Sequence, residues 1–418
     1  MDKFLVAGGK KLFGEIKIGA AKNAYLPILA ACILVDGVVV LHNYPNYSDT
    51  DKMCEILRRV GAKVKLEEKT LIVDARSVKT SSISEELTSS LRASIFTLGP
   101  LLGRLRNAKI AYPGGCAIGA RPIDIHLLGL KKMGIEIIEN NGYICCDASK
   151  IHSCEFMLKF PSVGATENLM MASVLTDGVT KLHNCAMEPE ILDLQNFLNS
   201  LGAKICGAGT DEIIIHGVKK LSSGSYSPIS DRIIAGTYLI ATAMCGGKVT
   251  IKNINPMHMQ ALITKLGNSA CQIETCCDSI KVVSENRPLT LKEIETSVYP
   301  GIPTDLQAQL MALECVSKGT CQITENLFES RFKHVSQLLK MGANIKVDKN
   351  TAIIKGRKRL CAAEVYGEDL RGTAALVLAG LEAKGNSIIH NIHFLDRGYE
   401  CFENDLNKLG AEIKRVKE

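Results

Sequence analysis

The sequence contains no tryptophan, and only 5% of its 418 residues are aromatic. With 46% hydrophobic and 22% charged residues, the composition excludes a disordered or fibrous chain and requires a core of aliphatic side chains. No apolar run approaches the roughly 20 residues of a membrane-spanning helix, and no long apolar stretch follows Met1. We therefore expect a cytoplasmic protein without a membrane partner, and the length predicts two domains.

Metal-binding and disulfide patterns are also missing, although the chain has 16 cysteines. Cys145–Cys146 and Cys276–Cys277 are adjacent pairs, and no Cys-x-x-Cys motif stands with a second pair or with spaced histidines. The thiols should be reduced in the cytoplasm, and we expect no metal and no cofactor. The net charge of +6 comes without a basic run interleaved with aromatic residues, which argues against nucleic acid and favours a small anionic ligand.

A repeat occurs six times along the chain, marked by an apolar residue and a glycine at the end of an amphipathic segment. A strand follows each glycine, and a polar turn with a second strand comes next, as in residues 62–65 and 70–73. This pattern predicts a β-hairpin. The glycines are 65 to 75 residues apart and stand at positions 61, 134, 202, 267, 342 and 410.

Upstream of each hairpin lies a nearly all-apolar helix, followed by a glycine turn and a strand. Each repeat should therefore contain a helix, a strand, a second helix and two strands. The first helix is apolar almost all round and should be buried among its counterparts, whereas the second is amphipathic and should face solvent. Examples of the first helix are predicted at residues 24–34, 93–102, 233–244 and 306–316.

The sixth repeat ends after its first hairpin strand, and residues 3–7 look like the missing second strand. We therefore expect the N-terminal stretch to complete the last repeat. Three repeats per domain give one domain at residues 21–229 and a discontinuous second domain at 1–20 plus 230–418. An open solenoid would need polar capping repeats, which are missing, so we predict two separate α/β domains.

Polar or charged residues interrupt the apolar helices near their starts, at equivalent places in the six repeats. For any single residue, an ordinary N-cap or a solvated cation is the alternative explanation. Taken together, cations at the positive ends of helix dipoles indicate a bound anion. The residues are Lys22, Asn23, Arg92, Thr166, Glu167, Asn168, Asp231, Arg232, Thr304, Asp305 and Arg371.

Residues 112–122 form a loop of small and turn-forming residues that carries Cys116 and Arg121. Its three glycines permit changes of backbone conformation, which suits a mobile lid. A nearby guanidinium favours the thiolate, so Cys116 is a candidate acid or nucleophile. The alternative is a plain turn that carries one of the sixteen thiols.

Several short motifs follow one another along the whole chain. They are Ala21-Lys22-Asn23-Ala24 with Leu26-Pro27-Ile28, Pro113-Gly114-Gly115-Cys116 with Arg121-Pro122-Ile123-Asp124, Ser162-Val163-Gly164-Ala165-Thr166, Pro303-Thr304-Asp305, Phe328-Glu329-Ser330-Arg331-Phe332, Asp369-Leu370-Arg371 and Asp396-Arg397-Gly398-Tyr399-Glu400. In these motifs the chain resembles the UDP-N-acetylglucosamine 1-carboxyvinyltransferases, enolpyruvyl transferases that open the cytoplasmic branch of peptidoglycan synthesis. The resemblance implies two inside-out α/β domains, each of three repeats, with the active site in the cleft between them.

The resemblance also implies two substrates, phosphoenolpyruvate and UDP-N-acetylglucosamine. Phosphoenolpyruvate carries about three negative charges near neutral pH, which calls for several cationic side chains. The resemblance places Lys22, Arg121 and Arg397 at its phosphate and Arg331 and Arg371 near its carboxylate, and it leaves open which arginine holds which group. It places Asn23 and Asp305 beside the sugar hydroxyl. The implied contacts to the UDP-sugar are Arg92, Arg121, Pro122, Ile123, Asp124, Ile125, Pro161, Ser162, Val163, Gly164, Asp305 and Leu327.

In the implied reaction, the sugar 3-hydroxyl adds to C2 of phosphoenolpyruvate while C3 is protonated, and phosphate then leaves. We expect Cys116 to donate the proton to C3 and Asp305 to accept the hydroxyl proton, with Lys22 and Arg397 as further catalytic residues. Cys116 should also react with the epoxide fosfomycin. The protein should act as a monomer.

Two other functions remain open, and the sequence departs from the family motifs at two places. The sister family that makes 5-enolpyruvylshikimate 3-phosphate is one alternative, against which Asn23 and Cys116 argue. A non-catalytic paralogue that binds the UDP-sugar is the other. Gly19-Ala20-Ala21-Lys22 replaces the usual Ser-Gly-Ala-Lys, which we expect to remove a hydroxyl at a cap position, and Ser330 replaces a common Asn.

Overall fold

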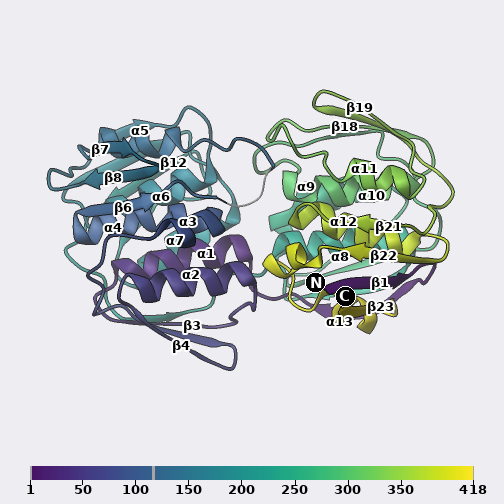
Figure 1. Ribbon diagram of the computed structural model, residues 1–418, viewed down its shortest axis with the longest axis horizontal. Coiled ribbons are helices and arrows are strands. Elements are labelled where there is room, and N and C mark those ends of the chain that lie inside the picture. The colour runs from purple at the N-terminus through teal and green to yellow at the C-terminus, as the bar shows by residue number, and fades with distance from the viewer. Residues whose placement is uncertain (1, 115–117, 418) are drawn as a thin grey trace. The chain divides into compact units, whose positions relative to one another are not determined.

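The computed structural model describes residues 2–114 and 118–417, which form a mixed α/β protein of two compact units (Figure 1). Unit 1 comprises Met1–Gly19, Ala117–Ala120 and Ser230–Glu418, and unit 2 comprises Ala20–Cys116 and Arg121–Ile229. The segment around residues 118–120 therefore groups with unit 1, although the loop was predicted to belong to the domain at 21–229. Unit 2 also begins one residue earlier than the predicted domain.

Each unit repeats one motif three times, as predicted. In five copies a helical segment, a strand, a second helical segment and a hairpin follow one another, and in the sixth only the first hairpin strand, β23, follows the second helix. The elements of unit 2 are α1 (Lys22–Ala31), η1 (Cys32–Leu34), β3 (Val38–Leu41), α2 (Ser48–Arg59), β4 (Lys63–Glu67), β5 (Thr70–Asp74), α3 (Glu85–Ser90), η2 (Arg92–Thr97), α4 (Leu98–Leu105), β6 (Asn107–Ala111), α5 (Asp124–Lys132), β7 (Glu136–Asn140), β8 (Tyr143–Asp147), β9 (Glu155–Met157), α6 (Val163–Ser173), β10 (Val179–His183), α7 (Pro189–Ser200), β11 (Lys204–Cys206), β12 (Glu212–His216) and β13 (Gly224–Tyr226).

The elements of unit 1 are β1 (Asp2–Ala7), β2 (Leu12–Lys17), α8 (Arg232–Cys245), β14 (Gly247–Lys252), η3 (Pro256–Met259), α9 (Gln260–Gly267), β15 (Gln272–Thr275), β16 (Ser279–Ser284), β17 (Glu293–Glu295), η4 (Thr304–Leu306), α10 (Gln307–Val316), β18 (Thr320–Thr324), α11 (Val335–Lys340), β19 (Ile345–Asp348), β20 (Thr351–Lys355), β21 (Glu364–Tyr366), α12 (Leu370–Glu382), β22 (Asn386–His390), η5 (Ile392–Arg397), α13 (Phe402–Lys408) and β23 (Glu412–Lys417).

Within the described residues the strands form six small sheets, one per repeat, of which five have four strands and one has three. The strand after the first helix pairs antiparallel with the second hairpin strand, as β3 does with β5. A further strand adds a parallel edge, as β9 does beside β10. The sequence pattern missed this edge strand because a run of three residues is too short to show alternation.

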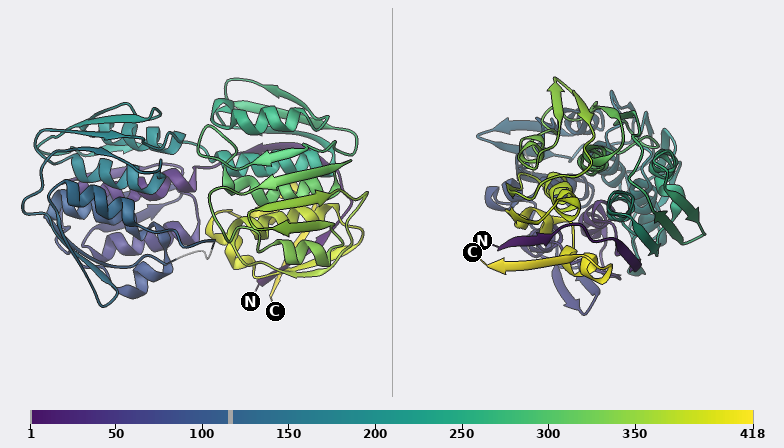
Figure 2. Two further views of the ribbon diagram at one scale, coloured as in Figure 1. Left: turned by 90° about the horizontal axis from the view of Figure 1, so that it is seen from above. Right: turned by 90° about the vertical axis from the view of Figure 1, so that its right-hand side faces the viewer.

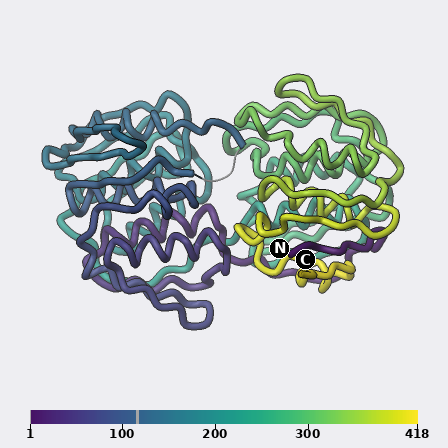
Figure 3. Tube along the Cα trace, viewed as in Figure 1, coloured from purple at the N-terminus to yellow at the C-terminus, as the bar shows by residue number. Residues whose placement is uncertain are grey.

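The N-terminal strand β1 completes the sixth repeat, which confirms the prediction. It pairs antiparallel with β22 and β23, and Asp2 lies opposite Lys417 (Figure 2). Figure 3 shows the purple N-terminal segment inside the unit that otherwise runs from green to yellow. Two edge strands pair with strands that are distant in the sequence. β2 directly precedes α1 but pairs with β14, and β13 directly precedes α8 but pairs with β3.

The first helices of the repeats form the cores, as predicted. All 14 residues of α8 are buried, and α8, α10 and α12 pack against one another in unit 1. In unit 2, α4 packs against α6. None of the helices in the described part of the chain combines the length and apolarity needed to cross a lipid bilayer.

Two helix predictions are wrong. The helix predicted at 93–102 is interrupted, because η2 ends at Thr97 and α4 begins at Leu98. The Asn168 side chain contacts the backbone on both sides of this break. It accepts a hydrogen bond from the Gly99 N–H at 2.6 Å and donates one to the Ile95 carbonyl at 2.8 Å. The second error is α7, which was expected to face solvent but is mostly buried because it packs against α1 and α6.

Candidate active site

Three helix starts of unit 1 carry the charged residues that the sequence placed there. Asp231 is the N-cap of α8, and Asp369 is the N-cap of α12. Asp305 lies in η4, which leads into α10, and Arg371 lies in the first turn of α12. These side chains lie close together, because Arg371 donates to Asp305 and is also affected by the charge of Asp231.

Asp305 lies between two buried guanidinium groups. Its Oδ1 accepts a hydrogen bond from Arg331 at 2.9 Å, and its Oδ2 accepts one from Arg371 at 2.9 Å. The arginine side chains are 3% and 4% exposed, whereas the Asp305 side chain is 26% exposed. Burial lowers the pKa of Arg371, but neighbouring negative groups, chiefly Asp305, outweigh this and raise it above its ordinary value. The carboxylate is thus the accessible member of a charged triad.

Glu325 supports this triad from the loop after β18. Arg331 donates from Nη2 to the Thr304 carbonyl at 3.2 Å, and the Thr304 hydroxyl donates to Glu325 Oε2 at 2.9 Å. Glu325 Oε1 in turn accepts a hydrogen bond from the Leu327 N–H at 2.9 Å. Leu327, a predicted UDP-sugar contact, is therefore tied to the segment that carries Asp305. The sequence did not reveal Glu325, because a glutamate in a polar loop carries no periodic signal.

His334 lies behind the triad and is 2% exposed. Within the described residues, neither of its ring nitrogens has a hydrogen-bond partner. Burial lowers its pKa to about 4, although the charge of Asp369 acts in the opposite direction. The ring is therefore neutral near pH 7 and adds no further positive charge to the two arginines. Asp369 itself accepts hydrogen bonds from the Arg371 and Gly372 N–H groups at 2.9 and 3.0 Å.

Arg397 is the last residue of η5 and is partly buried. Two residues later, the Tyr399 ring lies against Arg371, with 5.7 Å between the guanidinium carbon and the ring centroid. The Tyr399 hydroxyl is 2.8 Å from the Thr237 hydroxyl of α8. Of the predicted cations in unit 1, Arg331 and Arg371 meet at Asp305, and Arg397 lies on the segment that supports Arg371.

In unit 2, Lys22 forms a buried ion pair with Asp49 of α2. The Nζ to Oδ2 distance is 2.7 Å, and the side chains are 10% and 3% exposed. Asn23, the next residue of α1, is exposed. The sequence did not single out Asp49, since an acidic residue in the first turn of an amphipathic helix is common. The predicted cap is corrected, because the N-cap of α1 is Ala21, two residues after Gly19, so the replaced serine was not the cap.

Arg92 opens η2 and contacts the loop that precedes α5. Its guanidinium donates to the Pro113 carbonyl at 3.4 Å and to the Arg121 carbonyl. Burial, followed by the charge of Arg121, lowers the pKa of Arg92 to about 10. Arg121 has a φ of +46°, a conformation that is uncommon for residues other than glycine. A bound anion would relieve the repulsion between the two guanidinium groups.

The start of α6 lies against the same region. Ser162 caps the helix by accepting a backbone hydrogen bond at 3.4 Å. A Cβ atom at Gly164 would lie only 3.2 Å from the His126 ring, so this close approach favours glycine. Burial, followed by the charge of Arg92, lowers the pKa of His126 to about 3, so the ring is neutral. Contacts within unit 2 thus bring together the predicted UDP-sugar segments at Arg92, Arg121–Ile125 and Pro161–Gly164.

Thr166, Glu167 and Asn168 do not lie at a helix start, which corrects the prediction. They occupy the second turn of α6, which begins at Val163, and all three are fully buried. Neither carboxylate oxygen of Glu167 has a partner within the described residues. Burial, followed by two neighbouring glutamates, raises the pKa of Glu167 well above its ordinary value. These residues pack in the core of unit 2 rather than facing an anion at a helix end.

Cys116 lies outside the residues that the structure describes, so its acid role stays a prediction. Residues 118–120 attach to unit 1. The Ala120 N–H donates to Glu329 Oε1 at 2.7 Å, and the Ser330 N–H donates to the Ile118 carbonyl at 3.1 Å. The Ala120 N–H is the main cause of a lowered pKa at Glu329. These contacts explain why residues 118–120 group with unit 1.

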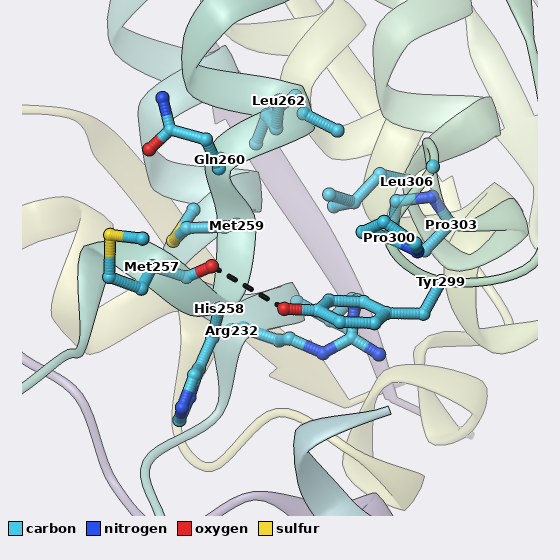
Figure 4. A pocket seen from close by; sticks show the side chains of 13 residues that line it. Arg232, Met257, His258, Met259, Gln260, Leu262, Tyr299, Pro300, Pro303 and Leu306 are labelled. Atoms are coloured by element: carbon cyan, nitrogen blue, oxygen red, sulfur yellow. Dashed lines mark hydrogen bonds between the residues drawn. The ribbon is translucent and has the colours of Figure 1, made fainter. Parts of the chain in front are cut away.

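A cavity of about 30 Å³ lies beside the start of α8 (Figure 4). Arg232 lies against the Tyr299 ring, with 5.4 Å between the guanidinium carbon and the ring centroid. The Tyr299 hydroxyl donates to the Met257 carbonyl at 3.4 Å (Figure 4). A cavity of this size holds a water molecule or two, so it is too small for a sugar nucleotide.

Comparisons with known proteins agree with the motifs. The family described as EPSP synthase (3-phosphoshikimate 1-carboxyvinyltransferase) matches residues 6–406. The chain is 49% identical over 416 residues to UDP-N-acetylglucosamine 1-carboxyvinyltransferase 2 of Caldanaerobacter subterraneus subsp. tengcongensis, with 100% of both chains covered. It is 46% identical over 418 residues to the UDP-N-acetylglucosamine 1-carboxyvinyltransferase of Coxiella burnetii, covering 100% of this chain and 96% of that one.

Solved structures share the fold. The enolpyruvyl transferase NikO from Streptomyces tendae superposes with a TM-score of 0.88 at 23% identity over 99% of both chains. An EPSP synthase from Acinetobacter baumannii superposes with a TM-score of 0.76 at 16% identity over 100% of both chains. At these identities the likeness concerns the fold alone, and it confirms the predicted two-domain α/β architecture.

Proposed function

The chain belongs to the enolpyruvyl transferase family, and on this basis we propose that it transfers the enolpyruvyl group of phosphoenolpyruvate to the 3-hydroxyl of UDP-N-acetylglucosamine, with release of phosphate. The names of its relatives include this acceptor and carboxyvinyl transfer. One observation carries the proposal most directly: Asp305 is accessible and is held at 2.9 Å from each of two buried arginines.

The electrostatics of unit 1 suit an acidic substrate and a base. The carboxylate of Asp305 is the exposed member of the triad, so we assign it as the acceptor of the hydroxyl proton. Arg331 and Arg371 present guanidinium groups of the kind that bind carboxylate and phosphate. We assign them to the carboxylate of phosphoenolpyruvate and assign Arg397, together with Lys22 and Arg121 of unit 2, to its phosphate.

The neighbouring segments of unit 2 suit a sugar nucleotide. Arg92 and Arg121 place two cations close together, which matches the charge of a diphosphate. We propose that these segments contact the UDP-sugar, that Leu327 contributes from unit 1, and that Asn23 flanks the reacting hydroxyl with Asp305. The proposed unit 2 contacts are Arg92, Arg121, Pro122, Ile123, Asp124, Ile125, Pro161, Ser162, Val163 and Gly164.

The proposed reaction is an addition followed by an elimination. In the addition, the sugar oxygen bonds to C2, Asp305 accepts the hydroxyl proton and Cys116 donates a proton to C3. In the elimination, the Cys116 thiolate left by the addition takes a proton from C3, the bond from C2 to the phosphate oxygen breaks, and phosphate leaves with the proton that Asp305 accepted. Lys22 and Arg397 stabilise the charge on the departing phosphate. No cofactor takes part in this scheme.

Phosphate release tests the proposal and its alternatives. The protein is mixed with phosphoenolpyruvate and either UDP-N-acetylglucosamine or shikimate 3-phosphate, and free phosphate is measured. Phosphate release with UDP-N-acetylglucosamine but not with shikimate 3-phosphate supports the proposal. Release with shikimate 3-phosphate would assign the activity for which the matching family is described. Binding of the UDP-sugar without release of phosphate would make the chain a non-catalytic sugar-nucleotide binder.

Replacement of Cys116 tests the proton donor. Cys116→Ser should lower turnover by about 10²- to 10⁴-fold, because a hydroxyl is a far weaker acid at this task, while UDP-sugar binding stays near wild type. Cys361→Ser, at an exposed thiol of unit 1, is the matched control and should keep full turnover. Full activity of Cys116→Ser at neutral pH would exclude the acid role.

We further propose that the protein acts in the cytoplasm as a monomer, in the first committed step of peptidoglycan synthesis. The acceptor supports this placement, because UDP-N-acetylglucosamine is a soluble nucleotide sugar. Size-exclusion chromatography with light scattering at micromolar concentration tests the monomer, and a mass of 45.3 kDa is the expected result.

A further inference from the structure

A cluster of exposed cations lies at the end of unit 1 that is remote from Asp305. Four of them line an open depression. The fifth, Lys318, precedes Gly319, whose carbonyl accepts a hydrogen bond from the Gly356 N–H at 3.0 Å. This end carries the last residues of α10 and α12, whose first residues lie near Asp305 and Arg371. The 13 residues of α12 span about 20 Å. We call the cluster the basic patch, and it consists of Lys318, Arg357, Lys358, Arg359 and Lys384.

Backbone hydrogen bonds hold the patch on a fixed frame. The Arg357 N–H donates to the Cys315 carbonyl at the end of α10 at 2.8 Å. The Lys384 N–H donates to the Leu360 carbonyl at 2.9 Å, which joins the residues after α12 to the residues after β20. The cations are therefore brought together by the fold from separate parts of the chain.

Helix dipoles do not account for this much positive charge. Each helix C-terminus is equivalent to about half a negative charge, so α10 and α12 together supply about one. The end of α10 is already occupied by Arg287, which donates to the Val316 carbonyl at 2.6 Å and the Ser317 carbonyl at 2.8 Å. Most of the charge of the basic patch thus exceeds what the helix ends require.

Carboxylates do not neutralise the patch either. Within the described residues, none of its five side chains makes an ion pair or hydrogen bond. Exposed lysines elsewhere do pair, as Lys150 does with Glu136 at 3.3 Å and Lys219 with Asp177 at 2.7 Å. Glu382 is the acid that the charge of Arg359 affects, and burial raises its pKa to about 7. Near neutral pH this carboxyl group is only partly ionised.

The surroundings indicate which anion the patch suits. Residues 287–290, 317–319, 356–360 and 383–385 contain no aromatic residue, and single-stranded nucleic acids are usually held by stacking on aromatic rings. The depression is open to solvent, unlike a site that encloses one small anion. Leu289, paired with Lys318 across an isolated bridge, is 45% exposed. The open form and the five cations suit the charged headgroups of an extended anionic surface.

We propose that the basic patch is a docking surface for membranes that contain anionic phospholipids. Clusters of about four to eight basic residues beside a membrane span or on an amphipathic helix bind anionic lipids electrostatically, and the five cations of the basic patch match that number. The sequence expectation of no membrane partner rested on the lack of a spanning segment, and peripheral binding needs none. The patch is far from Asp305 along the helices, so docking leaves the candidate active site accessible. This inference does not depend on the proposed function.

Vesicle co-sedimentation tests the docking surface. The full chain is mixed with vesicles of pure phosphatidylcholine or with 30% phosphatidylglycerol, at low and at high salt. The patch variant is Arg357→Gln/Lys358→Gln/Arg359→Gln. A control variant, Lys131→Gln/Lys181→Gln/Lys204→Gln, removes the same charge from exposed lysines of unit 2. A second patch variant, Arg357→Lys/Arg359→Lys, keeps the charge.

Wild type, the control and the charge-keeping variant should bind the anionic vesicles, and binding should vanish at about 0.5 M salt because exposed charges are then screened. The patch variant should bind on the order of 100-fold more weakly, since each basic residue contributes about fivefold. Equal losses in the patch and control variants would refute a specific patch. Wild-type binding to neutral vesicles would also refute the proposal, and tighter binding to RNA than to anionic vesicles would identify a nucleic-acid surface instead.

Discussion

At the scale of single residues, the buried charged side chains pair with residues from distant parts of the chain. Lys22 pairs with Asp49, and Asp305 pairs with two arginines. A buried pair of this kind contributes little net stability, because desolvation offsets attraction, but removing one partner leaves an uncompensated charge. Removing one member of such a pair should therefore lower the free energy of unfolding more than removing both members.

The Lys22–Asp49 pair provides a direct test of this sensitivity. Asp49→Ala should lower the free energy of unfolding by about 3 to 5 kcal/mol, because it leaves the Lys22 ammonium buried without its carboxylate. The double variant Lys22→Ala/Asp49→Ala should recover part of that loss. Urea unfolding of wild type, both single variants and the double variant gives the coupling energy. Additive single losses would contradict a coupled pair.

His334 predicts a pH dependence of stability. Its pKa is about 4 in the folded protein against an ordinary value of 6.5, so between these values the unfolded chain binds the extra proton. The free energy of unfolding should therefore fall as the pH drops from 6.5 towards 4, by at most about 1.4 kcal/mol per pH unit from this residue. Urea unfolding between pH 7.5 and 4.5 measures the slope.

His334→Asn should reduce that slope without abolishing it, because His126 also has a low pKa and contributes in the same direction. His216→Asn, at an exposed histidine of β12, is the matched control and should keep the wild-type slope. An unchanged slope in His334→Asn would mean that other groups cause the acid sensitivity.

At the scale of helices and strands, the residues at the helix starts have two roles. Some carry the side chains of the candidate site, and some accept hydrogen bonds from the first backbone N–H groups. Asp231 and Asp369 cap α8 and α12 with their own carboxylates. The α1 start has no side-chain cap, and its first residue, Lys22, is instead held by the ion pair with Asp49. N-caps and ion pairs thus fix the orientation of the charged side chains at these helix starts.

Residues 118–120 are held by the Glu329 side chain and by a backbone hydrogen bond from Ser330, both from the segment between β18 and α11. In Glu329→Ala the Ala120 N–H loses its acceptor, so its amide hydrogen should exchange on the order of fivefold faster. Ser330→Ala is the matched control, because the backbone N–H of residue 330 still donates to the Ile118 carbonyl. Hydrogen exchange followed by mass spectrometry resolves peptides that cover residues 118–122. Equal exchange in wild type and Glu329→Ala would show that Glu329 does not hold this segment.

Strands from both ends of the sequence meet in one sheet at the scale of the whole molecule. β1 lies between β22 and β23, so it contributes two ladders of hydrogen bonds to unit 1. Asp2 and Lys417 are opposite each other, like the ends of a hairpin. Unit 1 is therefore complete only when the first and last strands are paired.

A circular permutant tests this closure. Joining the ends with a flexible linker of about five residues and opening the chain at the exposed turn between Glu67 and Thr70 should preserve the fold, since both sites are hairpin-like. The permutant should unfold within a few degrees of wild type and retain UDP-sugar binding. A chain that lacks residues 2–7 should fail to fold, because β22 and β23 then lack their shared neighbour. If that truncation folded normally, β1 would not be essential to the sheet.

Much of the fold follows from the sequence, because it depends on local periodicity. The apolar helices, the hairpins and the missing strand at residues 3–7 all appear as patterns of neighbouring residues. Most of the edge strands and the break at Thr97 were missed. The edge strands β9, β13, β17 and β21 have three residues each, too few to show a period. The break depends on Asn168, which is distant in the chain.

The sequence by itself determined the sixfold repeat, the two-domain α/β class and the positions of charged residues at several helix starts, since each is encoded within a few turns of chain. Only the tertiary structure decided which partner each charge takes. Arg371 and Asp305 are 66 positions apart, and Ala120 and Glu329 are 209 apart. An ion pair depends on distance in space and on burial, and neither is encoded in the spacing of residues along the chain.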